Sequence, residues 1–504
     1  MGQYYDALVA HLSDIHNLNM AYWLLQWDQN TMMPPGGAAA RAAQMATLQR
    51  IRHEMLISDH TQQLLDAAEK EIGASAFEST PASMIRVARR DAEDAASLPA
   101  DFVARYAQAT ADAFEVWKQA KANNDYAAFV PALQRILDLK FEEVSLRGHS
   151  GHPYDVFLNH WEKGLTTEQV KAIFDAQRPA LVELVAAVNA NQDQVDDSVL
   201  HQPFDVARQR ELSLYASTAF GFDYDRWARM DVAPHPFCLQ IATHDIRLTT
   251  RFDPNFFNPA FFGTLHETGH GLHGHGFAPE IDGTFLSDMD KFSHSVCESQ
   301  SRTWENLVGR SRPFYEWLFP KLVEVFPDQF KNSSPEAVYK AVNKAKPQFI
   351  RVEADELTYN LHIMLRFEVE LAIVEGQVRL EDAPELWNAK FQEFFGITPP
   401  DHRVGILQDI HWSMGGMGAF VGYALGNLLS VQYYNQALKA HPNIPDQIAR
   451  GEFGTLHGWL VENIYQHGRK FTADELTQRV TGEGIQSNDF VAYLQTKFTD
   501  VYGL

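Results

Sequence analysis

The chain has 504 residues, of which 45% are hydrophobic and 21% charged, the composition of a globular protein large enough to bury an extensive core. Its net charge of −23 disfavours a phosphate-binding surface, and without basic runs a nucleic-acid partner is not expected. The only cysteines, Cys238 and Cys297, exclude a disulfide framework, fit a reducing compartment, and are interpreted as buried spectator thiols.

The N-terminus lacks a basic segment followed by an apolar core, so no secretory signal is expected. No apolar stretch approaches the roughly 20 residues that a membrane-spanning helix needs. We therefore expect a cytoplasmic protein with no membrane partner.

Helical periodicity dominates the chain, which predicts a mainly α fold. Two apolar stripes flank a turn at residues 33–37: Leu8, Leu12, Ile15 and Leu18 before it, and Met45, Leu48, Ile51 and Met55 after it. The polar residues 189–197 predict a loop. Further along, Ser334 followed by proline predicts a helix start, and Thr472 with Glu475 predicts a capping box.

Residues 240–252 are the main exception to helix, because their side chains alternate with a period of two. One face would carry Asp245, Arg247 and Thr249, and the other Ile246, Leu248 and Thr250. We interpret this stretch as one strand that ends at Asp253, shortly before the next helix.

The sequence L-H-E-T-G-H-G-L at residues 265–272 is the most informative part of the chain. His266 and His270 are four residues apart and share one face of a helix, so both imidazoles can point at one ion. Neutral imidazole nitrogens suit Zn²⁺, and Glu267 is placed to take a proton from water at the metal. The pattern predicts a zinc site.

The flanking residues support a helix at this position. Asn258 is a good N-cap, Pro259 suits the first helical position, and Gly271 and Gly274 offer a stop. The alternative is a histidine-rich helix end with an ordinary surface glutamate, but the agreement of cap, helix and motif favours the metal site.

The third metal ligand has several candidates. His273 lies on the same face as His266, but three histidines from one short helix would strain tetrahedral geometry. A second helix is predicted at residues 293–310, and it carries Glu298 and Glu305 on one face. We prefer Glu298, which would lie opposite the histidines in an antiparallel pair. Glu305 would then support a ligand from behind, or be a solvated helix residue.

Taken together, these motifs resemble the carboxypeptidase Taq type of metallocarboxypeptidase, peptidase family M32. The resemblance covers essentially the whole chain, with family-like stretches already near residues 27–36. Six elements occur in the expected order: H-P-F at 235–237, D-x-R-x-T at 245–249, H-E-x-x-H at 266–270, E-S-Q at 298–300, I-R-x-x-A-D at 350–355 and G-x-x-Q-D-x-H-W at 405–412. One departure is Cys297, which stands where the family usually has histidine.

The resemblance implies two helical lobes flanking a deep active-site cleft, with a small β-sheet beside the H-E-x-x-H helix, in a single metallocarboxypeptidase domain over residues 1–504. It also implies a homodimer and broad specificity for peptides with a free C-terminal carboxylate, with poor cleavage next to proline. The expected metal is Zn²⁺, bound by His266, His270 and Glu298, although this ligand set also binds Co²⁺ and Mn²⁺.

Two residues are expected to stabilise the oxyanion. His411 and Tyr423 resemble the histidine and tyrosine that fill this role in related zinc peptidases, and the glycine-rich residues 415–418 could let Tyr423 swing over the substrate. The alternatives are a core histidine beside Trp412 and a surface tyrosine.

A guanidinium fork is the natural receptor for the C-terminal carboxylate. Arg351 is our first choice and Arg247 the second, and His235 is expected to line the same cleft. The alternative for Arg351 is an intrahelical pair with Asp355, four residues later.

Two other functions fit parts of the pattern. A zinc endopeptidase of similar fold would cut internal bonds, but the two arginine motifs favour binding of a chain end. A non-catalytic helical scaffold could keep a structural zinc, but such a site has no need for Glu267 beside its first ligand.

Overall fold

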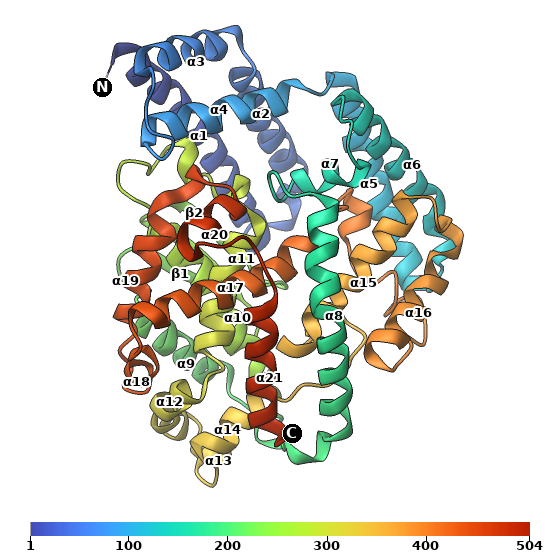
Figure 1. The fold of residues 1–504 in the computed structure, drawn as a ribbon, viewed down its shortest axis with the longest axis vertical. Coiled ribbons are helices and arrows are strands. Elements are labelled where there is room, and N and C mark those ends of the chain that lie inside the picture. Colours follow the sequence, from blue (N-terminus) through green and yellow to red (C-terminus); the bar gives the residue numbers. More distant parts are fainter. Residues whose placement is uncertain (1) are drawn as a thin grey trace.

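The computed structural model describes residues 2–504 and is mainly helical, as predicted. The N-terminal helices lie together at one end of the long axis of the molecule, shown in blue at the top of Figure 1: α1 (Gln3–Thr31), α2 (Ala38–Leu56), α3 (Asp59–Ile72) and α4 (Thr80–Ala96). The predicted turn between the first two stripes is a short 3₁₀ helix, Pro35–Gly37.

The next helices lead to the sheet: α5 (Ala100–Asn123), α6 (Tyr126–Leu146), α7 (Pro153–Asn159), α8 (Thr167–Ala190) and α9 (Val206–Ala219). The first two residues of the predicted loop at 189–197 are helical, since α8 ends at Ala190, and the rest includes a single 3₁₀ turn. In Figure 1, α8 runs beside the C-terminal helix α21 (Asn488–Tyr502), so segments far apart in the sequence pack together.

A small sheet precedes the histidine helix, as expected, but it has three strands in the order β1-β3-β2. These are β1 (Ala228–Val232), β2 (Cys238–Ala242) and β3 (Asp245–Thr250), with β1 parallel and β2 antiparallel to β3. The prediction of one strand over 240–252 was therefore wrong. Alternation continues across a tight turn at residues 243–244, so the period alone does not reveal that the chain reverses there.

The histidine helix α10 (Asn258–His275) begins at Asn258, with Phe257 as its N-cap. The predicted stop at Gly271 and Gly274 was wrong, because both glycines serve close packing inside the helix. A Cβ on Gly271 would lie 2.4 Å from the ring of Phe222, and one on Gly274 would lie 2.5 Å from the side-chain oxygen of Gln240. The glycines let α10 lie directly on the sheet.

The second predicted helix is α11 (His294–Arg302), continued by a π-helical segment, Thr303–Val308. It passes close to α10, since a Cβ on Gly269 would lie only 2.5 Å from the carbonyl oxygen of Gln300. On its other side lies α17 (Phe420–Ala440), where a Cβ on Gly426 would come within 2.6 Å of the Cβ of Glu298. Glycines on both neighbours thus fix the position of α11.

The remaining helices complete the body: α12 (Arg312–Val325), α13 (Pro327–Phe330), α14 (Pro335–Val342), α15 (Glu356–Val374), α16 (Ala383–Phe395), α18 (Ile444–Ile448), α19 (Gly454–Asn463) and α20 (Ala473–Thr481). Ser334 caps α14, and Thr472 forms a reciprocal capping box with Glu475 at the start of α20, so both predicted helix starts are confirmed.

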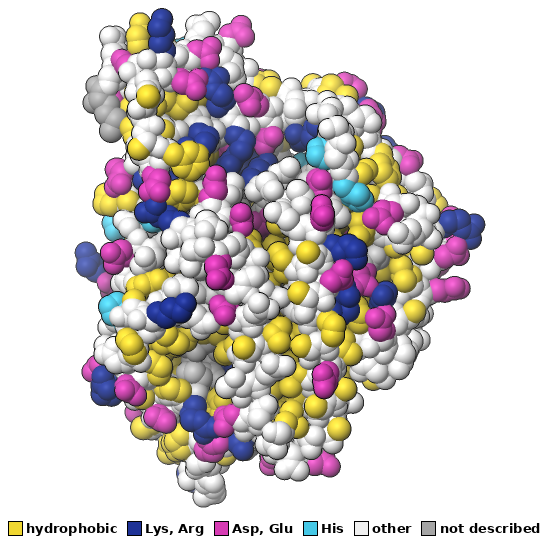
Figure 2. Space-filling model, in the orientation of Figure 1, with side chains coloured by type: hydrophobic (Ala, Val, Ile, Leu, Met, Phe, Trp, Pro, Cys, Tyr) yellow, Lys and Arg dark blue, Asp and Glu magenta, His cyan; other side chains and the backbone are white. Residues whose placement is uncertain are grey.

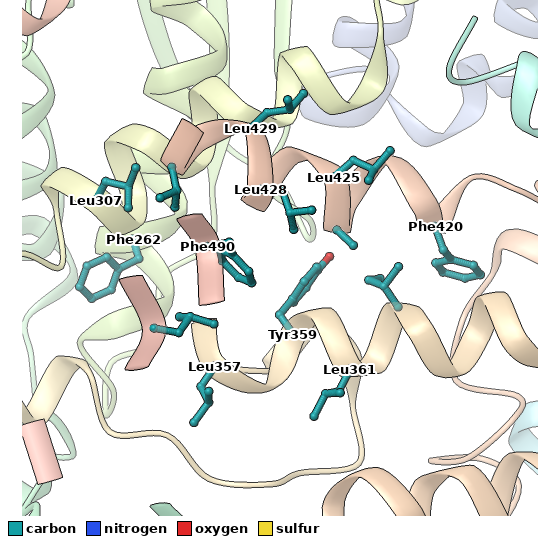
Figure 3. Close-up of a cluster of buried hydrophobic side chains, with 14 of the residues drawn as sticks. Phe262, Leu307, Leu357, Tyr359, Leu361, Phe420, Leu425, Leu428, Leu429 and Phe490 are labelled. Atoms are coloured by element: carbon teal, nitrogen blue, oxygen red, sulfur yellow. The ribbon is translucent and has the colours of Figure 1, made fainter. Parts of the chain in front are cut away.

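The two larger of three apolar clusters among the described residues contain most of the buried core. The larger one includes helices α15 and α17, between which Tyr359, Leu425 and Leu428 interdigitate (Figure 3). The smaller one joins α1, α3 and α4 to the segment that follows α10; its members include Leu8, Leu12, Ile15, Leu65, Met84, Phe277, Ile281, Phe285 and Leu286. The N-terminal helices therefore share a core with residues from the middle of the chain.

Figure 2 shows acidic and basic side chains intermixed over one face of the molecule. None of the helices within residues 2–504 combines the length and apolar character needed to cross a membrane.

Candidate active site

His266, His270 and Glu298 converge between α10 and α11. The Nε2 atoms of the two histidines lie 3.6 and 3.5 Å from Oε2 of Glu298, and one ligand atom from each residue falls within 4.8 Å of the others. This donor set, two imidazoles and a carboxylate, fits a divalent metal and leaves a coordination position open. The antiparallel approach of the two helices brings the preferred third ligand opposite the histidine pair.

The second nitrogen of each imidazole has its own partner. Nδ1 of His266 lies 2.9 Å from Oε2 of Glu305, which therefore contacts a predicted ligand from behind, as one of our interpretations held. Nδ1 of His270 lies 3.2 Å from Sγ of Cys297. Both imidazoles thus have Nε2 free to face Glu298. Cys297 and Cys238 are both only partly buried, so the prediction of buried thiols was wrong.

Arg302 was not among the predicted site residues. Its Nε donates to Oε1 of Glu298 at 2.8 Å, and its Nη1 donates to Oε2 of Glu305 at 3.1 Å. Burial works to raise the pKa of both carboxyls, but Arg302 and the histidines hold that of Glu298 well below its usual range and bring that of Glu305 to about 2. The signal was available, since Arg302 follows Glu298 by four residues on a predicted helix.

Glu267 follows His266 on α10 and is only 6% exposed. Burial raises its pKa above the ordinary value, and the negative charges of Glu298 and Glu305 add to this effect, whereas the histidines oppose it. A carboxylate with a raised pKa is a stronger base and is better suited to take a proton from water.

Arg351 lies in a short 3₁₀ helix, Arg351–Glu353, and does not form the intrahelical pair that we considered. Its partner is Asp409, with Nε 3.0 Å from Oδ1, while its Nη1 donates to the hydroxyl of Tyr359 at 2.9 Å. Arg366 donates to the other oxygen of Asp409 at 2.6 Å. Two buried guanidiniums therefore share one carboxylate, which leaves a net positive charge.

Asp355 instead caps α15, accepting a hydrogen bond from the backbone N–H of Thr358 at 3.0 Å. Asp409 belongs to the G-x-x-Q-D-x-H-W element at residues 405–412, but no role was predicted for this aspartate. Burial alone would raise its pKa, but Arg366 and Arg351 hold it far below the usual range.

His411 and Tyr423 lie near each other, with ring centroids 6.2 Å apart. The guanidinium carbon of Arg351 lies 5.2 Å from the centroid of the Tyr423 ring. Burial, followed by the charge of Arg351, lowers the pKa of His411 to about 3, so this imidazole is neutral at physiological pH. His294, which we had not singled out, packs edge-on against Tyr423 at 4.4 Å between centroids.

The glycine-rich stretch before Tyr423 is held in place. Glu370, buried on α15, accepts hydrogen bonds from the backbone N–H of Gly418 at 3.0 Å and from Nε1 of Trp412 at 2.6 Å. The hydroxyl of Tyr106 donates to the carbonyl of Gly415 at 3.0 Å. Tyr423 itself lies in the first turns of α17.

The last two predicted residues come from the sheet region. Arg247 on β3 donates two hydrogen bonds, of 2.7 and 2.8 Å, to Asp245, so its fork is occupied within its own strand. His235 is solvent-exposed, and its pKa is lowered by desolvation and then by the positive charges of Arg351, Arg251 and His266. The charges acting on His235 connect it to the candidate site.

Comparison with known proteins places this geometry in a family. Residues 7–498 match the family described as Carboxypeptidase Taq (M32) metallopeptidase. The chain is 37% identical to thermostable carboxypeptidase 1 of Thermus thermophilus over 95% of each protein, and 34% identical to carboxypeptidase 1 of Bacillus subtilis over 99% of this chain and 98% of the relative.

Solved structures agree. The M32 carboxypeptidase from Deinococcus radiodurans R1 superposes with a TM-score of 0.96 at 37% identity, covering 100% of both chains. The mainly helical fold with its small sheet, the full-length sequence match and the convergence of the H-E-x-x-H histidines with a carboxylate all lead to one assignment. The chain belongs to the M32 family of carboxypeptidase Taq metallopeptidases, which makes it a peptidase that depends on a divalent metal.

Proposed function

We propose that this protein is a zinc-dependent carboxypeptidase of broad specificity that removes single residues from the free C-terminus of peptides. The observation that carries the proposal is the group His266, His270 and Glu298, with Glu267 beside it on the same helix. A bound Zn²⁺ would polarise the scissile carbonyl and make a water molecule a stronger acid. Co²⁺ or Mn²⁺ could substitute for it.

The protein's own residues would carry the proton transfers and charge stabilisation. Glu267 takes a proton from the attacking water and returns it to the leaving amine, for which its raised pKa is suited. His411, neutral at physiological pH, and the hydroxyl of Tyr423 donate hydrogen bonds to the carbonyl oxygen as negative charge develops there.

Arg351 would bind the C-terminal carboxylate. The net positive charge of the cluster formed by Arg351, Arg366 and Asp409 supports this role, since a carboxylate would neutralise it. Arg247 is the weaker candidate, because its charge is balanced by Asp245 alone, whereas Arg351 and Arg366 share the single carboxylate of Asp409. His235 would contact the substrate at the outer part of the site.

The first test is a mass-spectrometric time course on a peptide with a free C-terminus and on its C-amidated twin. Stepwise loss of single residues from the free peptide only, abolished by a chelator and by Glu267→Gln, is the expected result. Internal fragments from both peptides would indicate an endopeptidase. Binding of metal without any cleavage would indicate a non-catalytic helical scaffold with a structural metal.

A second test addresses Arg351 directly. Arg351→Ala should raise KM strongly for peptides with a free C-terminus, because the receptor for the carboxylate is lost. Arg247→Ala serves as the comparison and should have the smaller effect. An unchanged KM in Arg351→Ala would remove Arg351 from this role.

Location in the cytoplasm, a single domain with two lobes around a deep cleft, and assembly as a homodimer are parts of the same proposal. The two free cysteines agree with a reducing compartment. Size-exclusion chromatography with light scattering would test the dimer.

A further inference from the structure

The two predicted metal-binding histidines are supported from behind in different ways. Glu305 stands 2.9 Å from Nδ1 of His266, as a carboxylate commonly does behind a ligand histidine. At the equivalent place behind His270 stands a thiol, Sγ of Cys297, 3.2 Å from Nδ1. The two histidines of the candidate site therefore differ in the chemistry of the group that contacts Nδ1.

The position of the sulfur is fixed by the packing of α11. Cys297 immediately precedes Glu298, and its backbone N–H donates to the carbonyl of Ser293, the N-cap residue of this helix, at 3.0 Å. Because Gly269 and Gly426 bring α10 and α17 against α11, the sulfur cannot shift without the carboxylate beside it.

The tautomer of His270 follows from which nitrogen faces the metal position. Nε2 lies 3.5 Å from Oε2 of Glu298, so its lone pair must point into the group if His270 is to bind a cation. The proton of the neutral imidazole then sits on Nδ1, where Sγ of Cys297 is the hydrogen-bond acceptor.

We propose that Cys297 is a positioning residue of the metal site, whose sulfur accepts the Nδ1–H of His270 and so fixes the tautomer and orientation of that imidazole. The inference rests on the proposed function, because it requires a metal at His266, His270 and Glu298. A sulfur accepts hydrogen bonds more weakly than a carboxylate. The imidazole of His270 is therefore oriented by a weaker acceptor than the carboxylate that stands behind His266.

The test measures zinc affinity by competition with a chromophoric chelator, so it needs no turnover. The purified, metal-free full chain is compared with Cys297→Ala, Cys297→Ser and Cys238→Ala. We expect Cys297→Ala to weaken zinc binding about 10- to 100-fold, the usual cost of losing such a partner. Cys297→Ser should recover most of the affinity, since its hydroxyl accepts the same hydrogen bond, and Cys238→Ala should match the wild type.

Two controls make the result specific. Circular dichroism of the metal-free variants should be unchanged, and an equal loss in Cys238→Ala and Cys297→Ala would mean that general packing is responsible, which overturns the proposal. Unchanged affinity in Cys297→Ala would also overturn it. A third result would overturn the proposal: a thiolate-to-metal charge-transfer band in the Co²⁺-loaded wild type that is absent from Cys297→Ser. Such a band would mean that the sulfur itself binds the metal.

Failure of this inference is distinguishable from failure of the proposed function. If His266→Ala and Glu298→Gln bind zinc as tightly as the wild type does, the predicted metal ligands are wrong. If those changes abolish binding while Cys297→Ala does not alter it, only the role of Cys297 is lost.

Discussion

Arg302 donates a hydrogen bond of 2.8 Å to Oε1 of Glu298, while Oε2 of the same carboxylate faces the imidazoles of His266 and His270. One oxygen is held by a fixed cation, and the other, which accepts a hydrogen bond of 3.2 Å from Ser301, faces the predicted metal position. Without metal, Arg302 pairs with both Glu298 and Glu305, and the carboxylate of Glu305 also lies 3.6 Å from Arg310.

Replacing Arg302 should therefore have its largest effect on the metal-free protein. We expect Arg302→Gln to lower the free energy of unfolding of the chelated protein by about 3–5 kcal/mol, because the buried carboxylate of Glu298 loses its guanidinium partner. Added zinc restores positive charge, so it should stabilise the variant by more than it stabilises the wild type. Denaturant unfolding with and without zinc measures both quantities.

The matched control is Arg105→Gln, which removes an exposed arginine from its pair with Glu142 and should leave stability nearly unchanged. Equal stabilisation of Arg302→Gln and wild type by zinc would contradict the compensating role of Arg302.

Asp409 should be essential to the cluster that holds Arg351. Asp409→Asn leaves Arg351 and Arg366 as two buried cations without their shared carboxylate, and we expect a loss of about 3–5 kcal/mol in stability. KM for free peptides should rise as Arg351 loses its orientation, while zinc affinity stays unchanged. Asp382→Asn, at an exposed pair with Arg379, is the control. A variant with wild-type stability would show that the cluster does not need its carboxylate.

Because α10 and α11 are in close contact, adding one methyl group between them should lower the stability of the protein. In Gly269→Ala the new Cβ would lie 2.5 Å from the backbone oxygen of Gln300, so the helices must move apart. We expect a destabilisation of about 1–3 kcal/mol and weaker zinc binding, since Glu298 moves with α11. Gly458→Ala, in α19 with no atom within 4 Å of the added Cβ, should be neutral or stabilising by up to about 1 kcal/mol. Similar behaviour of the two variants would exclude tight packing at Gly269.

Glu162 predicts a specific pH dependence of stability. It is 2% exposed and accepts hydrogen bonds from Ser293 and Ser295 at the start of α11, and burial raises its pKa from 4.5 to about 7. A carboxyl whose pKa is raised in the folded protein contributes stability that is fully present below pH 4.5 and is lost as the pH rises through about 7.

The shift corresponds to about 3 kcal/mol, at roughly 1.4 kcal/mol for each pKa unit. The free energy of unfolding should therefore fall more between pH 5 and pH 8 in the wild type than in Glu162→Gln, which cannot ionise. Parallel pH profiles for the two proteins would refute this.

Local periodicity was enough to predict much of this structure. The i, i+4 spacing of His266 and His270, the helix caps at Ser334 and Thr472, and the alternation of residues 245–250 all depend on neighbours in sequence, and the corresponding elements are present. The same reasoning merged two strands into one, because a hairpin preserves alternation through its turn.

Contacts between distant segments could not be predicted in this way. Asp409 lies between Arg351 and Arg366 only because the loop before α17 returns to α15. Likewise, Cys297 reaches His270 because the glycines of α10 and α17 set the depth of α11. Glycines at 271 and 274 suggested a helix end, yet their role depends on a sheet that packs against them.

The smaller apolar cluster has a consequence for the order in which the protein can fold during synthesis. Helices α1, α3 and α4 emerge from the ribosome first, but Phe277, Ile281, Phe285 and Leu286, which complete their core, are translated much later. Until then the N-terminal helices expose apolar side chains that have no partner. The nascent chain therefore passes through a stage in which chaperones can bind its N-terminal part, and this part folds fully only after the histidine helix has been made.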